Sequence, residues 1–453
     1  RVQALIVLSA GFAERDEAGA AAEAELVDYA RRHGMRLVGP NALGVINTDP
    51  AVRMHATFVA VDPLPGRIGL MAQSGTIGAA IIDGARQVGL GISSFVAVGN
   101  KADVSGNDLL RYWQDDPATD VAMLYLESFG NPSKFSRIAR ALSRVKPVVA
   151  VKVGGSATEP GLDPEGWPGD ATAAALLDQT GVIRVDNLTQ MFHTAGVLAH
   201  QPLPAGNRVA VVTNSWGPAW LAVDALRAWG LDAADPIDLS NQAGPEAFRD
   251  ALAEAHADPR VDAVLAIYAP GVTTHYRKVG AAIREAASRP GAVTTVACLL
   301  GQHGPSTLAD GPVRVPQFPF PEEAAAALGR VAGYAAWRAR PVGDAFHLDD
   351  EALALVRAMV AHHLVDAAPA RPGASDGDAD ARRWLDPRSA AALLDAVGCG
   401  PVAQEVVADA DEAVAAARRL GYPVALKAAG LDRLSKTEAG GVATATLRSE
   451  ALE

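Results

Sequence analysis

Cysteine is scarce in this sequence, with only Cys298 and Cys399 among 453 residues. Each lies in an otherwise apolar segment, which argues against a disulfide framework or a thiolate metal site and agrees with a reducing cytoplasm. The sequence also lacks an uncharged apolar run of about 18 residues and a basic-then-apolar signal peptide. We therefore expect a cytoplasmic protein that does not associate with membranes.

Basic runs and aromatic residues are also few. The formal net charge is −12 and no lysine-rich run occurs, so we expect no binding of nucleic acid through a sheath of phosphate contacts. Hydrophobic residues make up 49% of the chain, but aromatic residues only 5%. This balance favours α/β layers packed with Ala, Val and Leu over an all-β sandwich.

What is present is an alternation of apolar strands and amphipathic helix patterns. The first block predicts a strand at 4–8, a helix at 18–33 and a strand at 36–38. The second block predicts strands at 68–73, 94–98, 121–127, 148–153 and 182–185. Near-continuous apolar strands separated by helices indicate a parallel sheet covered on both faces.

The third block partly repeats the second. "GRIGLMAQSGTIGAAIIDGARQVGL" at 66–90 aligns with "NRVAVVTNSWGPAWLAVDALRAWGL" at 207–231, and "DPATDVAMLYLES" at 116–128 aligns with "DPRVDAVLAIYAP" at 258–270. Both pairs are offset by about 141 residues, which indicates a duplicated domain. The alternative is two unrelated parallel-sheet domains with similar strand–Gly–helix starts.

Two features at strand ends are candidate sites. The turn "QSGT" at 73–76 joins a strand to a helix of small residues. Its backbone N–H groups and the helix dipole favour an anion, although Ser74 would also serve as an ordinary N-cap. Glu127 ends a strand at the carboxyl edge of the sheet, where α/β proteins bind ligands. The alternative for Glu127 is a solvated strand end.

A third candidate is Asn41, in the turn "GPNALG" at 39–44, which either contacts a nucleotide or only closes a loop. Histidine is informative by its absence, because none occurs between His55 and His193. His193 lies in a helical pattern typical of a packed histidine rather than a catalyst. No His or Cys spacing indicates a metal site.

Motifs across nearly the whole chain, in a fixed order, resemble the NDP-forming acyl-CoA synthetases, the fused relatives of succinyl-CoA synthetase. They include "LVGPNALGVIN", "PGRIGLMAQSGTIG", "VGNKADVSGNDLLRYWQDDP", "KPVVAVKVGGS" and "GYPVALKAAG…SKTEAGGV". The resemblance implies an α/β protein with several domains, here a piece truncated at both ends. The implied domains are the second half of a CoA-binding Rossmann-like domain (1–62), two flavodoxin-like domains (66–200 and 207–345), a helix and linker (346–383), and the start of an ATP-grasp domain (384–453).

The resemblance also implies site residues. Two facing helix N-termini would hold a phosphorylated histidine, which Glu127 would orient. The residues implied to bind phosphate are Gln73, Ser74, Gly75, Thr76, Asn214, Ser215 and Gly217. Those implied to bind CoA are Gly39, Pro40 and Asn41, and those implied to bind ATP are Lys427 and Lys436. No metal ligand is expected within the chain.

The sequence departs from the family at two places. The family carries its phosphoryl-accepting histidine in a loop after "KVGGS", but the corresponding segment here has none. Its acids, Asp163, Glu165 and Asp170, would repel a phosphate. The ATP-grasp loop usually reads His-Lys-Ser/Thr, whereas this chain has Ser435-Lys436-Thr437.

Without the histidine, the chain is similar to the regulatory part of bacterial protein lysine acetyltransferases, in which a GNAT domain is fused to such a region. This resemblance implies a region that binds CoA or acyl-CoA without completing ligation and regulates a fused GNAT acyltransferase. One alternative is an active ADP-forming acyl-CoA ligase, and another is a non-catalytic scaffold. The expected ligands are a small-molecule CoA ester and, only if the ATP-grasp domain is complete in the parent protein, ATP with Mg²⁺. The oligomeric state stays open.

Overall fold

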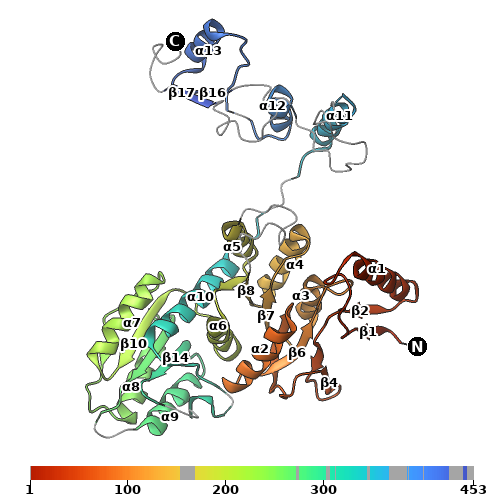
Figure 1. Cartoon of the computed structure of the whole chain (residues 1–453). Coiled ribbons are helices and arrows are strands. Elements are labelled where there is room, and N and C mark those ends of the chain that lie inside the picture. The colour runs from red at the N-terminus through yellow and green to blue at the C-terminus, as the bar shows by residue number, and fades with distance from the viewer. Residues whose placement is uncertain are drawn as a thin grey trace. The chain divides into compact units, whose positions relative to one another are not determined.

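The computed structural model describes residues 2–153, 169–271, 275–302, 307–311, 313–343, 347–366, 385, 387–400, 402–427 and 442–445. The chain forms two compact units, Arg1–Pro341 and Val342–Glu453. The first unit contains two parallel-sheet cores and a small N-terminal layer (Figure 1).

The N-terminal layer is a parallel strand pair with one helix. Its elements are β1 (Ala4–Ile6), α1 (Glu17–Arg32) and β2 (Arg36–Val38). Asp16 caps α1, because its side chain accepts a hydrogen bond from the Gly19 N–H at 2.7 Å. The predicted strands and helix of this block are therefore present, with ends that differ by one or two residues.

The first large sheet has seven strands in the order β4-β3-β6-β5-β7-β8-β9. Its strands are β3 (Gly44–Asn47), β4 (Met54–Thr57), β5 (Pro65–Ala72), β6 (Ile92–Ala97), β7 (Val121–Leu126), β8 (Val148–Lys152) and β9 (Ile183–Val185). Strands β5 to β9 are parallel. The order β6-β5-β7 places a topological switch point beside β5, where such sheets bind ligands.

Helices cover both faces of this sheet. The helices of this block are α2 (Gly75–Gln87), α3 (Gly106–Asp115), α4 (Pro132–Val145), α5 (Gly169–Thr180) and α6 (Leu188–His200). Helices α2 and α6 pack in the core on one face, and α3, α4 and α5 pack in the core on the other. The predicted parallel sheet with two covered faces is confirmed.

The hairpin of β3 and β4 was not predicted. It pairs antiparallel with β6 and so extends the sheet of the second block with residues that precede the proline-rich segment at 62–67. Both strands are only four residues long and carry several polar residues. Such short, mixed strands give little periodic signal, since their position is decided by pairing with β6.

The second large sheet repeats this arrangement. Its order is β11-β10-β13-β14-β15, with β12 also pairing β10, and all its pairs are parallel. The strands are β10 (Arg208–Thr213), β11 (Asp232–Ala233), β12 (Ile237–Asp238), β13 (Ala263–Tyr268), β14 (Thr294–Leu299) and β15 (Gln317–Phe318). The helices are α7 (Trp216–Ala228), α8 (Pro245–Ala257), α9 (Tyr276–Ala287), η1 (Thr307–Ala309) and α10 (Pro321–Ala339).

An ion pair recurs at the same place in both sheets. Arg67, in β5, pairs with Asp120 just before β7, and its Nη2 donates to the Pro117 carbonyl at 2.8 Å. Arg208, in β10, pairs with Asp262 at 2.7 Å just before β13, and its Nη2 donates to the Pro259 carbonyl at 3.1 Å. This shared detail supports duplication over two unrelated domains with similar starts.

Helices α6 and α10 join the two sheets. Met191 of α6 and Tyr334 of α10 pack in the core of the first sheet, whereas Val197 and Val331 of the same helices pack in that of the second. The Tyr334 hydroxyl donates to the Ser143 carbonyl at 2.8 Å, within α4. The two parallel-sheet domains thus share one helical layer.

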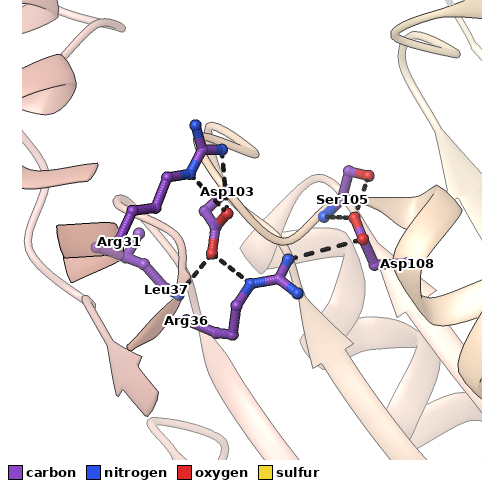
Figure 2. Close-up of polar contacts among 6 residues, drawn as sticks. All are labelled: Arg31, Arg36, Leu37, Asp103, Ser105 and Asp108. Atoms are coloured by element: carbon purple, nitrogen blue, oxygen red, sulfur yellow. Dashed lines mark hydrogen bonds and ion pairs between the residues drawn. The ribbon is translucent and has the colours of Figure 1, made fainter. Parts of the chain in front are cut away.

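Asp103 fastens the N-terminal layer to the first sheet (Figure 2). Its carboxylate accepts hydrogen bonds from the Leu37 N–H at 2.9 Å, Arg36 Nε at 2.8 Å and Arg31 Nη2 at 3.1 Å. The Asp103 side chain is only 6% exposed. Burial alone would raise the pKa of Asp103, but these hydrogen bonds outweigh it and lower the pKa below its usual value.

We expect Asp103→Asn to lower the free energy of unfolding at pH 7 by roughly 2 kcal/mol, since hydrogen bonds to charged groups each contribute about 1.5–3 kcal/mol. The folded-state pKa lies below the unfolded value of about 3.9. The carboxylate therefore stabilises the fold above that value, and the contribution is lost as the pH falls through the folded-state pKa.

Urea unfolding at pH 7, 5 and 3 tests this expectation. The gap between wild type and Asp103→Asn should narrow toward pH 3, whereas Asp28→Asn, an exposed position on α1, should stay within about 0.5 kcal/mol of wild type throughout. A gap that is independent of pH would mean that the charge of Asp103 contributes nothing.

The second unit is described by itself. It contains α11 (Asp350–Asp366), α12 (Pro387–Ala396), α13 (Ala410–Leu420), β16 (Val424–Lys427) and β17 (Val442–Ala445). Strands β16 and β17 pair antiparallel. Across the described residues, no helix combines the length and the apolar character needed to cross a bilayer.

Candidate functional site

The turn from β5 into α2 presents a helix start at the carboxyl edge of the seven-stranded sheet. Ser74 is the N-cap of α2, and its Oγ accepts a hydrogen bond from the Ile77 N–H at 3.4 Å. The first turn of α2, all of which is described, carries no acidic side chain. The positive end of the helix dipole is therefore left for an external anion. A Cβ on Gly75 would lie 3.3 Å from Leu43 Cβ. Glycine at this position therefore lets the loop that follows Asn41 pack closely against the start of α2.

Gln73 fixes the end of the neighbouring strand. Its Oε1 accepts hydrogen bonds from the backbone N–H groups of Glu127 at 2.7 Å and Ser128 at 2.9 Å, and its Nε2 donates to the Ser128 carbonyl at 2.7 Å. The Gln73 side chain is thus used within the protein. Its predicted contact with phosphate stays a prediction, but its structural effect is to hold Glu127 beside the start of α2.

Asn214 does the same in the second sheet. Its Oδ1 accepts from the Ala269 N–H and its Nδ2 donates to the Ala269 carbonyl, both at 2.8 Å. The two domains therefore share one arrangement. An amide side chain directly after one strand (β5 or β10) forms hydrogen bonds with the backbone directly after the neighbouring strand (β7 or β13). Only the first copy places an acid, Glu127, at the strand end so held.

The helix start of the second copy differs from the first. Ser215 is the N-cap of α7 but makes no side-chain cap hydrogen bond. Trp216 occupies the position of Gly75, is 54% exposed, and stacks on Trp220 with ring centroids 6.2 Å apart. A bulky indole thus stands at this helix start, next to the predicted phosphate contacts of Ser215 and Gly217. That the two helix starts face each other stays a prediction.

Glu127 is exposed at the end of β7, as the sequence analysis allowed. Among the described residues, its carboxylate accepts no hydrogen bond and has no cation within 4 Å. Lys101 is near enough to feel its charge: burial lowers the pKa of Lys101, the charge of Glu127 opposes this, and the charge of Lys152 adds to it. Glu127 is therefore an exposed carboxylate near Lys101, on a backbone that Gln73 fixes.

The predicted CoA-binding turn lies against the loop after β6. The N–H of Asn100 donates to the Pro40 carbonyl at 2.9 Å, and the N–H of Ala102 donates to the Gly39 carbonyl at 3.3 Å. Gly39 and Pro40 are buried, whereas Asn41 is exposed in a left-handed conformation with φ of 57°. Of the three predicted residues, Asn41 is the one whose side chain faces solvent.

The remaining predicted residues are placed unevenly. Lys427 is exposed at the end of β16, while Lys436, Asp163 and Glu165 lie outside the described residues, as does the loop from 154 to 168 that follows "KV". The side chain of Asp170, near the start of α5, likewise lies outside the described part of the chain. In the described part of the chain no three His, Cys, Asp or Glu side chains gather as metal ligands would.

Two residues of the site, Lys101 and Trp216, were not predicted from the sequence. Lys101 follows the predicted strand at 94–98, and its position beside Ser128 depends on the folded loops. Its φ of +61° is uncommon for a residue other than glycine and often marks a functional turn. Trp216 was visible in the repeat alignment, opposite Gly75, and that mismatch was the available signal.

Comparison with known proteins finds matches to two domain families and to whole relatives of this chain. A family model described as "Succinyl-CoA ligase like flavodoxin domain" matches residues 65–198, and one described as "ATP-grasp domain" matches residues 377–453. The 4-hydroxybutyrate–CoA ligase [ADP-forming] of Nitrosopumilus maritimus is 30% identical over 98% of this chain and 65% of its own length. This chain thus spans just under two thirds of that relative.

Two further relatives match most of their own length. The alpha subunit of acetate–CoA ligase [ADP-forming] I of Pyrococcus furiosus is 30% identical over 75% of this chain and 79% of that subunit. The dinucleotide forming acetyl-coenzyme A synthetase 1 of Ca. Korarchaeum cryptofilum, solved with phosphate and ADP, superposes with a TM-score of 0.67 at 28% identity. That superposition covers 74% of this chain and 78% of the solved chain, and the predicted α/β architecture is thereby confirmed.

Proposed function

This chain belongs to the ADP-forming acyl-CoA synthetase family, and we propose that it forms the CoA-binding and acyl-activating part of a carboxylic acid–CoA ligase. The reaction joins an acid and CoA while ATP becomes ADP and phosphate. The observation that carries the proposal is the start of α2 beside Glu127, because it offers helix N–H groups to an anion next to an acidic residue whose backbone N–H is held by Gln73. The transfer of a phosphoryl or acyl-phosphate group needs such a site.

The cosubstrates follow from the same family. ADP-forming CoA ligase relatives and a matching ATP-grasp domain imply the use of CoA and ATP. We propose that CoA approaches through Asn41, since this exposed residue is attached to the loop after β6. Lys427 and Lys436 are the proposed phosphate partners of ATP, and Mg²⁺ is its proposed counterion. The acyl group is open, as the relatives' names span acetate and 4-hydroxybutyrate.

The domain limits are also part of the proposal. We keep 1–62, 66–200, 207–345, 346–383 and 384–453 as domains and linker. The pairing of β3 with β6 means that the end of the first segment is hydrogen-bonded into the sheet of the second. The N-terminal layer and the first flavodoxin-like domain would therefore act as one binding body.

A second candidate function is the one that the sequence analysis put first: a CoA-binding region that regulates a fused GNAT acyltransferase. The absence of histidine between His55 and His193 favours it, because the family's phosphoryl carrier has no counterpart there. The relatives favour ligation. A carboxylate can also attack ATP directly, giving acyl phosphate and ADP, and the CoA thiol can then displace phosphate.

Hydroxylamine trapping tests the choice. We expect the full-length protein with ATP, Mg²⁺ and one of a panel of carboxylic acids to form an acyl hydroxamate. The same protein without ATP is the control. If no acid in the panel gives a product while a CoA ester still binds by calorimetry, the regulatory function stands and ligation fails.

A further inference from the structure

A cavity of about 320 Å³ opens beside the candidate site, between the ends of the central strands and helices α3 and α4. Part of its wall is apolar and includes Met71, Leu126, Phe129 and Phe135. Phe135 is 2% exposed, and its ring lies 4.9 Å from that of Phe129. The volume is at the lower end of the roughly 300–1,000 Å³ that is usual for small-ligand pockets.

Charged and polar groups also line the cavity, among them Lys101, Lys134, Ser128 and Asn131. The one carboxylate among the lining residues, that of Asp103, is already paired with Arg31 and Arg36. The Lys101 ammonium donates to Ser128 Oγ at 2.6 Å. An ammonium has three N–H donors, and among the described residues this hydroxyl is its only hydrogen-bond partner, with no carboxylate within 4 Å. The charged form of Lys101 is thus only partly compensated, as its lowered pKa also indicates.

Asn107 adds a buried polar group. It lines the cavity, is 6% exposed, and its Oδ1 has no hydrogen-bond partner within the described part of the chain. Buried amide groups are nearly always paired. An unpaired one in a cavity wall indicates that a ligand or a water completes it.

We propose that this cavity binds the carboxylic acid that the protein activates, with the carboxylate at Lys101 and Ser128 and the hydrocarbon against Phe129 and Phe135. The inference rests on the proposed function and deepens it by naming a substrate class: an apolar or aromatic monocarboxylate longer than acetate. Acetate would leave most of the apolar wall exposed to solvent, whereas a chain of about six carbons or a phenyl ring would cover it.

The position of the cavity fits the chemistry. Ser128 is held by the Gln73 amide, and Gln73 itself lines the cavity. The next residue along the chain is Ser74, the cap of α2. A carboxylate at Ser128 would therefore lie close to the helix start where phosphate is expected. Inorganic phosphate could also bind the two lysines, but it would make no favourable contact with the apolar wall.

Calorimetry of the full chain without ATP or CoA tests the binding. We expect hexanoate and phenylacetate to bind at least tenfold more tightly than acetate, and hexanamide, which lacks the charge, not to bind measurably. Lys101→Met should weaken hexanoate at least tenfold. Phe129→Ala should weaken hexanoate severalfold and acetate little. Lys278→Met, an exposed lysine on α9, is the control and should change nothing.

The outcomes separate this inference from the proposed function. If the protein binds the acid through Lys101 but forms no acyl-CoA, the cavity is an acid-binding site and the ligase proposal is wrong. If the protein forms acyl-CoA but Lys101→Met does not change the KM for the acid, the cavity is not the acid-binding site, although the ligase proposal holds. The absence of heat with both longer acids, or binding of phosphate in their place, would also overturn the inference.

Discussion

Gly75→Trp is expected to lower the rate of acyl-CoA formation by roughly 100-fold while the protein stays folded. Gly75 is the first residue of α2, where the free N–H groups would meet a phosphoryl group. An indole there fills the space of the anion, and a 100-fold loss corresponds to about 2.8 kcal/mol at 1.4 kcal/mol per tenfold change.

The second sheet shows why folding should survive. Trp216 occupies the same position at the start of α7 and stays exposed against Trp220. The strand–turn–helix unit therefore accommodates tryptophan, with a small shift of Leu43 in the first copy. Trp216→Gly is the matched control and should leave turnover within about twofold. Wild-type turnover in Gly75→Trp would show that the start of α2 is not the anion site.

Gly99→Ala is expected to have the largest effect on stability, roughly 3 kcal/mol. Gly99 has φ of +54°, and a Cβ on it would lie 2.1 Å from the Pro40 carbonyl oxygen. The added methyl group would separate the loop after β6 from the turn at 39–41 and break the hydrogen bond from the Asn100 N–H to Pro40. The left-handed conformation alone costs a non-glycine residue about 1–3 kcal/mol.

Gly130→Ala separates these two terms. Gly130 has φ of +67°, and no atom lies within 4 Å of a Cβ built on it, so it would suffer only backbone strain of about 1 kcal/mol. Urea unfolding and CoA titration should show a greater loss of both stability and CoA affinity in Gly99→Ala. Equal losses in the two variants would mean that contact with Pro40 is unimportant.

The sequence could predict the features that depend on periodicity and on strand ends. The central parallel strands of both sheets, such as β5, β7, β10 and β13, are near-continuous apolar runs, and the turn at 73–76 carries an evident helix cap. The duplicated frame, including Arg67 and Arg208, was visible as an alignment. These features depend on residues close in sequence, or on one element repeated at a fixed offset.

The rest depends on contacts between segments that are far apart in sequence. That Gln73 binds phosphate stays a prediction, and its hydrogen bonds to the backbone of Glu127 and Ser128, more than fifty residues away, could not be predicted from the sequence. Lys101 is a candidate because it donates a hydrogen bond to Ser128 and is partly buried, and neither property can be read from a single sequence. The β3–β4 hairpin is fixed by its pairing with β6. Propensity has little weight against such tertiary constraints.

The nucleotide products decide whether the protein is an ADP-forming ligase. The full-length protein is incubated with ATP, Mg²⁺, CoA and hexanoate, and all products are quantified by chromatography. The account predicts acyl-CoA, ADP and phosphate in equal amounts, with no AMP. Formation of AMP and pyrophosphate, or no acyl-CoA from any acid that binds, would contradict it.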